Sequence, residues 1–208
     1  MSGLCFKTNN ESPDISVISR CADIILSGGI VIFPTETVYG IGVNALDTAA
    51  LERLYTKKQR PRSKPLLCHI SGIEQAEQIA VVDDTARTLI NRFTPGPLTL
   101  VLPKKDGLPD ILVAGGDTVG LRFPSNGIFL ALARECGVPV AATSANFSGG
   151  VSATDFDTLG GIAAEADAVI DGGKCLYSQE STILSLVNEP VILRQGAFPA
   201  ERLYEVLK

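Results

Sequence analysis

The sequence predicts a single α/β domain with a mixed β-sheet covered by helices. Strand-like apolar runs and amphipathic segments alternate along the whole chain, which is the pattern of a sheet layered with helices. Hydrophobic residues make up 45% of the 208 residues and charged residues only 20%, so the chain can bury a sizeable core. Neither a repeat nor a linker-like stretch interrupts the pattern. Residues 1–208 are therefore expected to form one domain.

The first third of the chain alternates helix and strand patterns. Isoleucines recur at helical spacing after Ser12 and Pro13, which predicts a capping serine and a proline at the first helical position. The β-branched run 30–33 is typical of a strand buried on both faces, and Asp47 predicts a helix cap. The expected elements are a helix from Ser12 to Ile25, strands at 30–33 and 40–43, a helix at 48–58 and a strand at 65–70.

The rest of the chain continues the same alternation. A helix is expected to begin at Asp83 or Asp84 and to end at the turn 94–97, and another runs over 128–136 before Gly137. The expected strands are at 98–102, 118–123, 140–143, 168–171, 182–186 and 191–193, and a closing helix is expected at 199–207.

Composition excludes several classes of protein. A net charge of −5 argues against a general nucleic-acid coat but not against one basic pocket. No run of about 18 apolar residues predicts a membrane span, and the N-terminus lacks the basic and apolar regions of a signal peptide. The five cysteines are odd in number and widely spaced, which predicts reduced, mostly buried thiols in a cytoplasmic protein. A single histidine, His69, rules out a multi-histidine metal site.

A run of cations follows the helix predicted at 48–58. No carboxylate lies between Glu52 and Glu74. Such a run can simply complement the helix dipole and sit in water. Here, however, prolines interleave the cations and two apolar strands flank them, so the side chains are held at a sheet edge, where α/β proteins bind ligands. Fixed arginines and lysines suit a polyphosphate. The cations are Lys57, Lys58, Arg60, Arg62 and Lys64.

Four further stretches carry polar side chains next to strands. The turn 34–40 contains two hydroxyls, a carboxylate and a phenol, and the loop 144–152 is rich in hydroxyls, amides and glycines that can cradle phosphate oxygens. Both stretches could instead satisfy only their own turn amides. Thr118 and Arg122 share one face of a strand, and Ser181 and Arg194 lie on adjoining strands near the end. A lone imidazole in an apolar strand, as at His69, is most often a packed core residue.

Together these features predict a concave site with several anion-binding groups and no catalytic triad, thiol–histidine pair or metal cluster. Catalysis in such a site would consist of positioning and electrostatics, as in phosphoryl or nucleotidyl transfer.

These motifs resemble the YrdC/TsaC family. They occur in the family's order and span about residues 12–200; they are FPTETVYGIG, KKQRPRSKPLLCHI, TPGPLTLVL, DTVGLRFP, TSANFSG and ESTI. The resemblance implies a twisted, open α/β sheet with a positively charged concave face. It also implies an L-threonylcarbamoyladenylate synthase, which joins L-threonine, bicarbonate or carbon dioxide and ATP (with Mg²⁺) and releases pyrophosphate. Partner proteins then use the product to modify adenosine in tRNA.

The resemblance also implies roles for individual residues, and it changes the interpretation of His69 from a core residue to a ligand contact. Lys58 and Arg60 match the family's Lys-x-Arg and would offset triphosphate charge. The expected L-threonine contacts are Thr37, His69, Arg122 and Ser181. The expected ATP contacts are Arg60, Lys64, Thr118, Ser144, Ala145, Asn146, Ser152 and Arg194.

Two alternatives remain at this point. The same cationic concavity could belong to an RNA-binding module, although that would need several phosphate contacts on an acidic chain. A paralogue could instead keep the fold and handle a different carbamoyl or acyl substrate. The intact Lys58-x-Arg60 and Ser144-x-Asn146 motifs favour the synthase.

Overall fold

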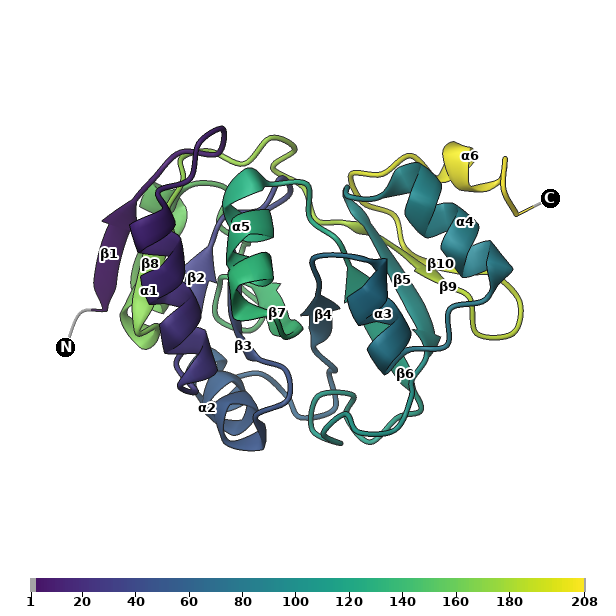
Figure 1. Ribbon diagram of the computed structural model, residues 1–208, viewed down its shortest axis with the longest axis horizontal. Coiled ribbons are helices and arrows are strands. Elements are labelled where there is room, and N and C mark those ends of the chain that lie inside the picture. Colours follow the sequence, from purple (N-terminus) through teal and green to yellow (C-terminus); the bar gives the residue numbers. More distant parts are fainter. Residues whose placement is uncertain (1–2, 208) are drawn as a thin grey trace.

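A computed structural model describes residues 3–207, which form ten strands in one continuous mixed sheet with helices packed against it (Figure 1). The strand order is β1-β8-β2-β3-β7-β4-β6-β5-β9-β10. Neighbours pair in parallel at β1/β8, β2/β8, β4/β6 and β5/β9, and antiparallel elsewhere. The α/β class and the mixed, open sheet predicted from the sequence are confirmed.

The strands are short and the helices modest in length. The strands are β1 (Leu4–Lys7), β2 (Val31–Phe33), β3 (Gly40–Asn44), β4 (Leu67–His69), β5 (Leu98–Pro103), β6 (Thr118–Arg122), β7 (Val140–Ser144), β8 (Ala168–Asp171), β9 (Thr182–Ser185) and β10 (Val191–Arg194). The helices are α1 (Ile15–Leu26), α2 (Thr48–Lys58), α3 (Ile73–Ile79), α4 (Asp84–Phe93), α5 (Gly127–Cys136) and α6 (Ala200–Leu203), with 3₁₀ turns at Phe156–Thr158 and Gly160–Glu165.

Helices pack on both faces of the sheet, but on each face they cover a different half of the strands. Helices α1 and α5 pack on one face of β2, β7 and β8, where Val31, Phe33 and Ile170 point toward them. Helices α2, α3 and α4 pack on the opposite face, against residues such as Ile41 and Leu121. On the face that packs against α1 and α5, the strands β4, β6, β5 and β9 contribute no residue to the apolar cluster under these two helices. Those strands provide the floor of the site described below.

The local elements differ from the sequence prediction at several places. Helix α1 is capped by Asp14, whose carboxylate accepts from the Ser16 backbone N–H at 2.8 Å, so the prediction of a Ser12 cap with Pro13 in the first turn was wrong. The closing helix is a single turn, Ala200–Leu203, rather than 199–207. Strand β1 and helix α3 were not predicted. Four cysteines are buried and Cys5 is exposed, as expected for mostly buried thiols.

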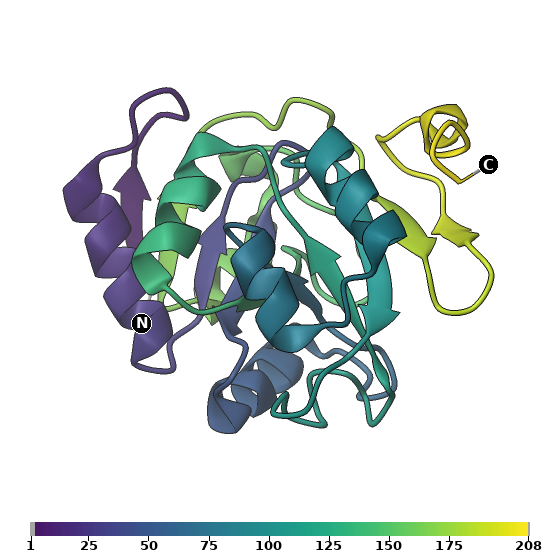
Figure 2. The ribbon, with the colours of Figure 1, turned by 45° about the vertical axis from the view of Figure 1, so that its right-hand side comes forward.

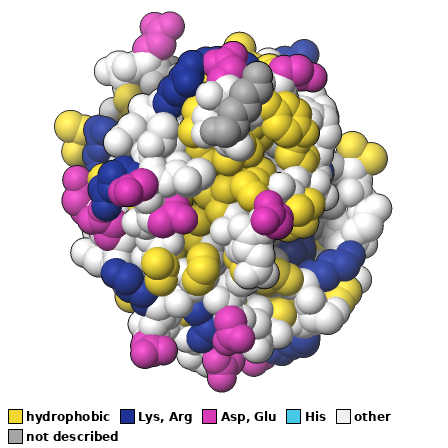
Figure 3. Space-filling view, turned by 90° about the vertical axis from the view of Figure 1, so that its right-hand side faces the viewer, with side chains coloured by type: hydrophobic (Ala, Val, Ile, Leu, Met, Phe, Trp, Pro, Cys, Tyr) yellow, Lys and Arg dark blue, Asp and Glu magenta, His cyan; other side chains and the backbone are white. Residues whose placement is uncertain are grey.

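The chain begins and ends at opposite ends of the molecule (Figure 1), and turning the molecule shows β9, β10 and α6 standing at one edge (Figure 2). Seen from that edge, hydrophobic side chains gather on the surface (Figure 3). Val191 and Leu193 on β10 and Tyr204 just after α6 are exposed. Between residues 3 and 207, no helix is long and apolar enough to cross a membrane.

Candidate active site

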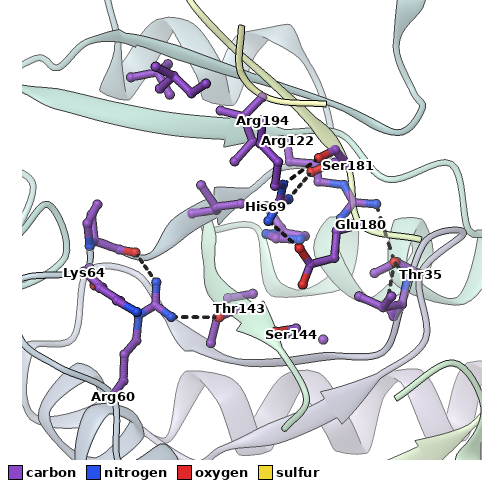
Figure 4. Close-up of a pocket in the computed structure, with 18 of the residues that line it drawn as sticks. Thr35, Arg60, Lys64, His69, Arg122, Thr143, Ser144, Glu180, Ser181 and Arg194 are labelled. Carbon is purple, nitrogen blue, oxygen red and sulfur yellow. Dashed lines mark hydrogen bonds and ion pairs between the residues drawn. The ribbon is translucent and has the colours of Figure 1, made fainter. Parts of the chain in front are cut away.

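A cavity of about 460 Å³ opens over β4, β6, β5 and β9. Its lining combines four cations with one carboxylate, several hydroxyls and an apolar floor. The lining residues are Thr35, Val38, Tyr39, Gly40, Arg60, Ser63, Lys64, Pro65, Leu67, His69, Val101, Arg122, Ala142, Thr143, Ser144, Glu180, Ser181, Ile183, Leu193 and Arg194. Figure 4 shows Arg60 and Lys64 together on one side, apart from Arg122, Arg194 and Ser181.

Strand register aligns the polar residues of the floor. His69 on β4 is paired with Arg122 on β6, Arg122 with Thr99 on β5, and Thr99 with Ile183 on β9. Residues paired across a sheet point to the same face, so this row presents its side chains together. Gly120 follows in the next row, and a side chain there would lie 2.5 Å from Leu67 Cδ2. The glycine therefore leaves Leu67 room to form part of the cavity wall.

The turn after β2 is held by its own hydroxyls. Thr35 Oγ1 donates to the Val38 carbonyl at 2.7 Å and accepts from the backbone N–H groups of Thr37 and Val38. The Thr35 and Thr37 hydroxyls are 2.9 Å apart, and both residues are buried. The turn thereby fixes two hydroxyls at the deep end of the cavity, the end that contains Arg122. The Thr35 hydroxyl also satisfies amides of its own turn, which is the structural role that the sequence left open for this stretch.

Arg122 is the buried cation of the deep end. Its Nη2 donates to Thr37 Oγ1 at 2.5 Å and lies 3.3 Å from Glu36 Oε2. Burial lowers the pKa of Arg122, while Glu36 opposes that shift and Arg194 adds repulsion. Arginine nevertheless stays charged in proteins, so the deep end keeps a positive charge for an anion.

Ser181 and Arg194 form a second polar group beside Arg122. The Ser181 and Thr99 hydroxyls are 2.8 Å apart, and Arg194 Nη2 donates to Ser181 Oγ at 3.2 Å. Arg194 also pairs with Glu180 at 2.6 Å, and Ser152 donates to the same carboxylate at 2.9 Å. Ser152 thus acts on the cavity through Glu180.

Arg60 lies at the far side of the cavity, just after helix α2. The chain leaves the helix through Gln59, whose φ of 55° is left-handed. Arg60 then donates to the Lys64 and Pro65 carbonyls at 3.0 and 2.7 Å and to Thr143 Oγ1 at 3.3 Å. These bonds bend the segment back on itself, and Lys64 itself is exposed at the mouth.

Lys58 does not face the cavity. Its side chain is 2% exposed, and its Nζ donates to the Ser144 carbonyl at 2.5 Å and to Asn146 O and Oδ1 at 2.6 and 3.1 Å. Burial lowers its pKa to about 8, Arg60 adds repulsion, and Glu180 acts in the opposite direction. In this geometry Lys58 fastens the loop after β7 to the end of α2. Lys58 was expected to offset triphosphate charge, and in this structure its Nζ is bonded to the loop after β7 and does not line the cavity.

The structure brings most, but not all, of the predicted site residues together. Those that line the cavity are Arg60, Lys64, His69, Arg122, Ser144, Ser181 and Arg194. Thr37 lies immediately behind, bonded to Arg122, and Asn146 and Ser152 act through neighbours. Ala145 is buried and Thr118 pairs with Pro103 at the other end of β6, so neither lies on the cavity wall.

Sequence reasoning missed several residues of the site. Thr143 lines the cavity from the end of β7, and Thr99 on β5 lies behind the lining, within hydrogen-bond distance of the Ser181 hydroxyl. No role was predicted for two carboxylates, Glu180 in the ESTI motif and Glu36 in the FPTETVYGIG motif. Two cations of the predicted run, Lys57 and Arg62, do not line the cavity and form surface ion pairs with Glu165 and Glu52. Within residues 3–207, no three His, Cys, Asp or Glu side chains gather to hold a metal ion.

The fold and site have close counterparts among known proteins. Residues 23–196 match the family described as "Telomere recombination" (Sua5_yciO_yrdC). The threonylcarbamoyl-AMP synthase of Bacillus subtilis is 40% identical over 204 residues, a match that covers 96% of this chain and 59% of that protein.

Two solved structures superpose over nearly the whole chain. Sua5 of P. abyssi, described as a complex with L-threonine, is 40% identical with a TM-score of 0.93, covering 98% of this chain and 61% of that one. YciO of E. coli is 26% identical with a TM-score of 0.88, covering 97% and 99%.

The protein is thus an α/β domain that carries a cationic cavity over a mixed sheet. The chain belongs to the Sua5/YciO/YrdC family. It spans about three fifths of the length of the B. subtilis and P. abyssi relatives, 59% and 61%.

Proposed function

We propose that this chain makes L-threonylcarbamoyladenylate and pyrophosphate from L-threonine, bicarbonate or carbon dioxide, and ATP. The observation that carries the proposal is one cavity with two separate cationic ends, Arg122 with Arg194 and Arg60 with Lys64. A small carboxylate and a triphosphate need different anion sites a short distance apart. The family relationship and the curated relative at 40% identity support the same activity.

L-Threonine occupies the deep end in this proposal. Arg122 takes its carboxylate, with the Ser181 hydroxyl beside it, because a guanidinium forms a two-point contact with a carboxylate. His69 and the hydroxyls of Thr35 and Thr37 form the wall that receives the rest of the amino acid. The P. abyssi relative described with L-threonine supports a threonine site within this fold.

ATP occupies the outer end. Arg60 and Lys64 face the phosphates, and Ser144 borders them from the loop after β7, with Arg194 at the boundary between the two substrates. Mg²⁺ enters with the triphosphate as part of that substrate, since this cation is usually held by phosphate oxygens and only one or two carboxylates. Lys58 contributes by holding the loop, through its bonds to Ser144 and Asn146.

The reaction needs no protein nucleophile. The threonine amine attacks bicarbonate or carbon dioxide to give an N-carboxylate, releasing water or a proton. An oxygen of this N-carboxylate then attacks the α-phosphorus of ATP. A P–O bond forms, and the α–β phosphoanhydride bond breaks as pyrophosphate leaves. Fixed cations around the phosphates stabilise the charge that develops on the leaving group. The product then passes to proteins that transfer the threonylcarbamoyl group to adenosine in tRNA.

The test is pyrophosphate release from ATP, with threonine and bicarbonate each omitted in turn. We expect release only when both are present. We also expect Arg122→Ala to raise the KM for threonine, and Arg60→Ala the KM for ATP, by about tenfold or more each, because each loses a charge-assisted contact.

The matched control is Lys57→Ala, which removes a neighbouring cation that pairs with Glu165 on the surface. It should leave both constants unchanged. Pyrophosphate release that ignores threonine would contradict the activity. Parent-like kinetics in both arginine variants would contradict the assignment of the two ends.

A further inference from the structure

Three of the four unpartnered buried polar atoms between residues 3 and 207 belong to two side chains at one spot. They are Glu36 Oε1, Glu36 Oε2 and Arg122 Nε, and the fourth is His69 Nδ1. Glu36, Arg122 and His69 are each 4% exposed. Buried polar groups are almost always satisfied, so a cluster of unsatisfied ones points to a functional arrangement.

The contacts of Arg122 are one-sided. Among the described residues, its contacts with Thr35, Thr37 and Glu36 all use Nη2. Glu36 Oε2 forms an ion pair with that nitrogen at 3.3 Å, but neither Glu36 oxygen nor Arg122 Nε has a hydrogen-bond partner among the described residues. A carboxylate and a guanidinium pair most strongly through two parallel bonds. The two side chains are therefore an ion pair placed side by side without the two parallel hydrogen bonds that such a pair can form.

Glu36 is held in place and is almost completely buried. It lies in the Thr35–Val38 turn, and its backbone carbonyl accepts from the Tyr177 N–H at 2.8 Å. It is absent from the cavity lining, whereas Arg122 is part of that lining. Any effect of Glu36 on a ligand must consequently pass through Arg122.

We propose that Glu36 is the positioning residue for Arg122, holding its Nε–Nη2 edge so that the rest of the guanidinium faces the carboxylate of the amino-acid substrate. The proposal rests on the function proposed above for the identity of that substrate. Without the carboxylate, a buried guanidinium with one hydrogen-bonded nitrogen could rotate about its long side chain, and its alignment with a small ligand would be lost.

The first measurement does not depend on activity. The ¹⁵N–¹H signal of Arg122 Nε, assigned by its loss in Arg122→Lys, reports the order of the guanidinium. We expect an ordered signal in the parent and a mobile or broadened one in Glu36→Gln. Glu77→Gln is the control, because Glu77 pairs with Arg87 on the surface at 2.6 Å and should leave the signal unchanged. An equally ordered Arg122 in Glu36→Gln would overturn the proposal.

The second measurement separates the two substrates. We expect Glu36→Gln to raise the KM for L-threonine about tenfold or more, the range for a lost hydrogen bond to a charged group, and to leave the KM for ATP within about twofold of the parent. A change in both constants would indicate a merely structural role and would count against the proposal. If the parent shows no threonine-dependent release, the proposed function fails, while the Arg122 signal still decides the role of Glu36.

Discussion

At the scale of single residues, His69 shows how packing sets the chemistry of a side chain. Its imidazole meets Phe129 and Phe33 edge-on, with ring centroids 5.5 and 6.3 Å away, and is 4% exposed. Burial, followed by repulsion from Arg122, holds the pKa of His69 well below its usual range. The ring is thus a neutral wall of the cavity at physiological pH, with no proton to give as an imidazolium.

Because the chain contains one histidine, this neutral state can be measured directly. We expect the Cε1–H NMR shift of His69 to stay constant from about pH 8 to about pH 5.5, since the ordinary pKa is about 6.5. A titration near pH 6.5 in the folded protein would contradict this expectation. The spectrum of the protein unfolded in urea provides the control, because there the imidazole titrates normally.

The lowered pKa of His69 also affects the stability of the fold, and the sign of the effect is definite. The unfolded chain binds a proton at His69 below about pH 6.5, whereas the folded chain does not. The contribution of His69 to the free energy of unfolding is therefore fully present above that pH. It is lost as the pH falls, by at most about 1.4 kcal/mol per pH unit.

At the scale of elements, the join between helix α2 and the loop after β7 depends on one lysine. Lys58 ends the helix and supplies the donors for two carbonyls and an amide oxygen of residues 144–146. The Lys58 carbonyl in turn accepts from the Ser148 N–H at 3.2 Å. The Lys-x-Arg and Ser-x-Asn motifs are thus joined into one structural unit through Lys58.

Replacing Lys58 by methionine tests this unit, since methionine keeps an apolar stem and removes the donors. We expect the free energy of unfolding in urea to fall by about 2 kcal/mol or more, because the buried carbonyls of Ser144 and Asn146 lose a charged donor. The KM for ATP should rise as Ser144 moves. Lys57→Met is the matched control and should change stability by less than about 0.5 kcal/mol, because its pair with Glu165 is half exposed. Equal effects of the two variants would contradict the role assigned to Lys58.

At the scale of the whole molecule, the site sits near the middle of a long sheet. β7 and β4 are the central strands, and β1 and β10 are the two edges. Two separate apolar clusters, one under α1 and α5 and one under α2, α3 and α4, meet along this central region. The cavity lies beside this region, over β4, β6, β5 and β9, on the face that α1 and α5 leave uncovered there.

This arrangement predicts an order of backbone amide exchange. Amides of β7 and β4, such as that of Cys68, should exchange slowest, and those of β1 and β10 fastest, because exchange near an edge needs only local opening. Hydrogen–deuterium exchange read by mass spectrometry or NMR measures this order. Faster exchange at β4 than at β10 would show that the centre of the sheet is not its most stable part.

Much of this fold could be predicted from local patterns. The strand at 30–33 and the helix at 48–58 could be predicted because the spacing of their apolar residues along the chain matches the period of each element. Strand β1 could not be predicted this way, because its four residues are mostly exposed and gain strand geometry only by pairing with β8. Helix α3 is short and begins at Gly72 without a side-chain cap, so it lacks a start signal.

The sequence by itself determined the class of the domain, most of its elements and the inventory of cations and hydroxyls available to a site. Tertiary structure alone decided which of those groups face the cavity. Arg122 meets Thr37 across 85 positions in the chain, and Lys58 meets Ser144 across 86. Strand register and burial set these contacts, and through them one lysine became a structural tie and one arginine became part of the cavity lining. Neither register nor burial is a property of the residues taken one at a time.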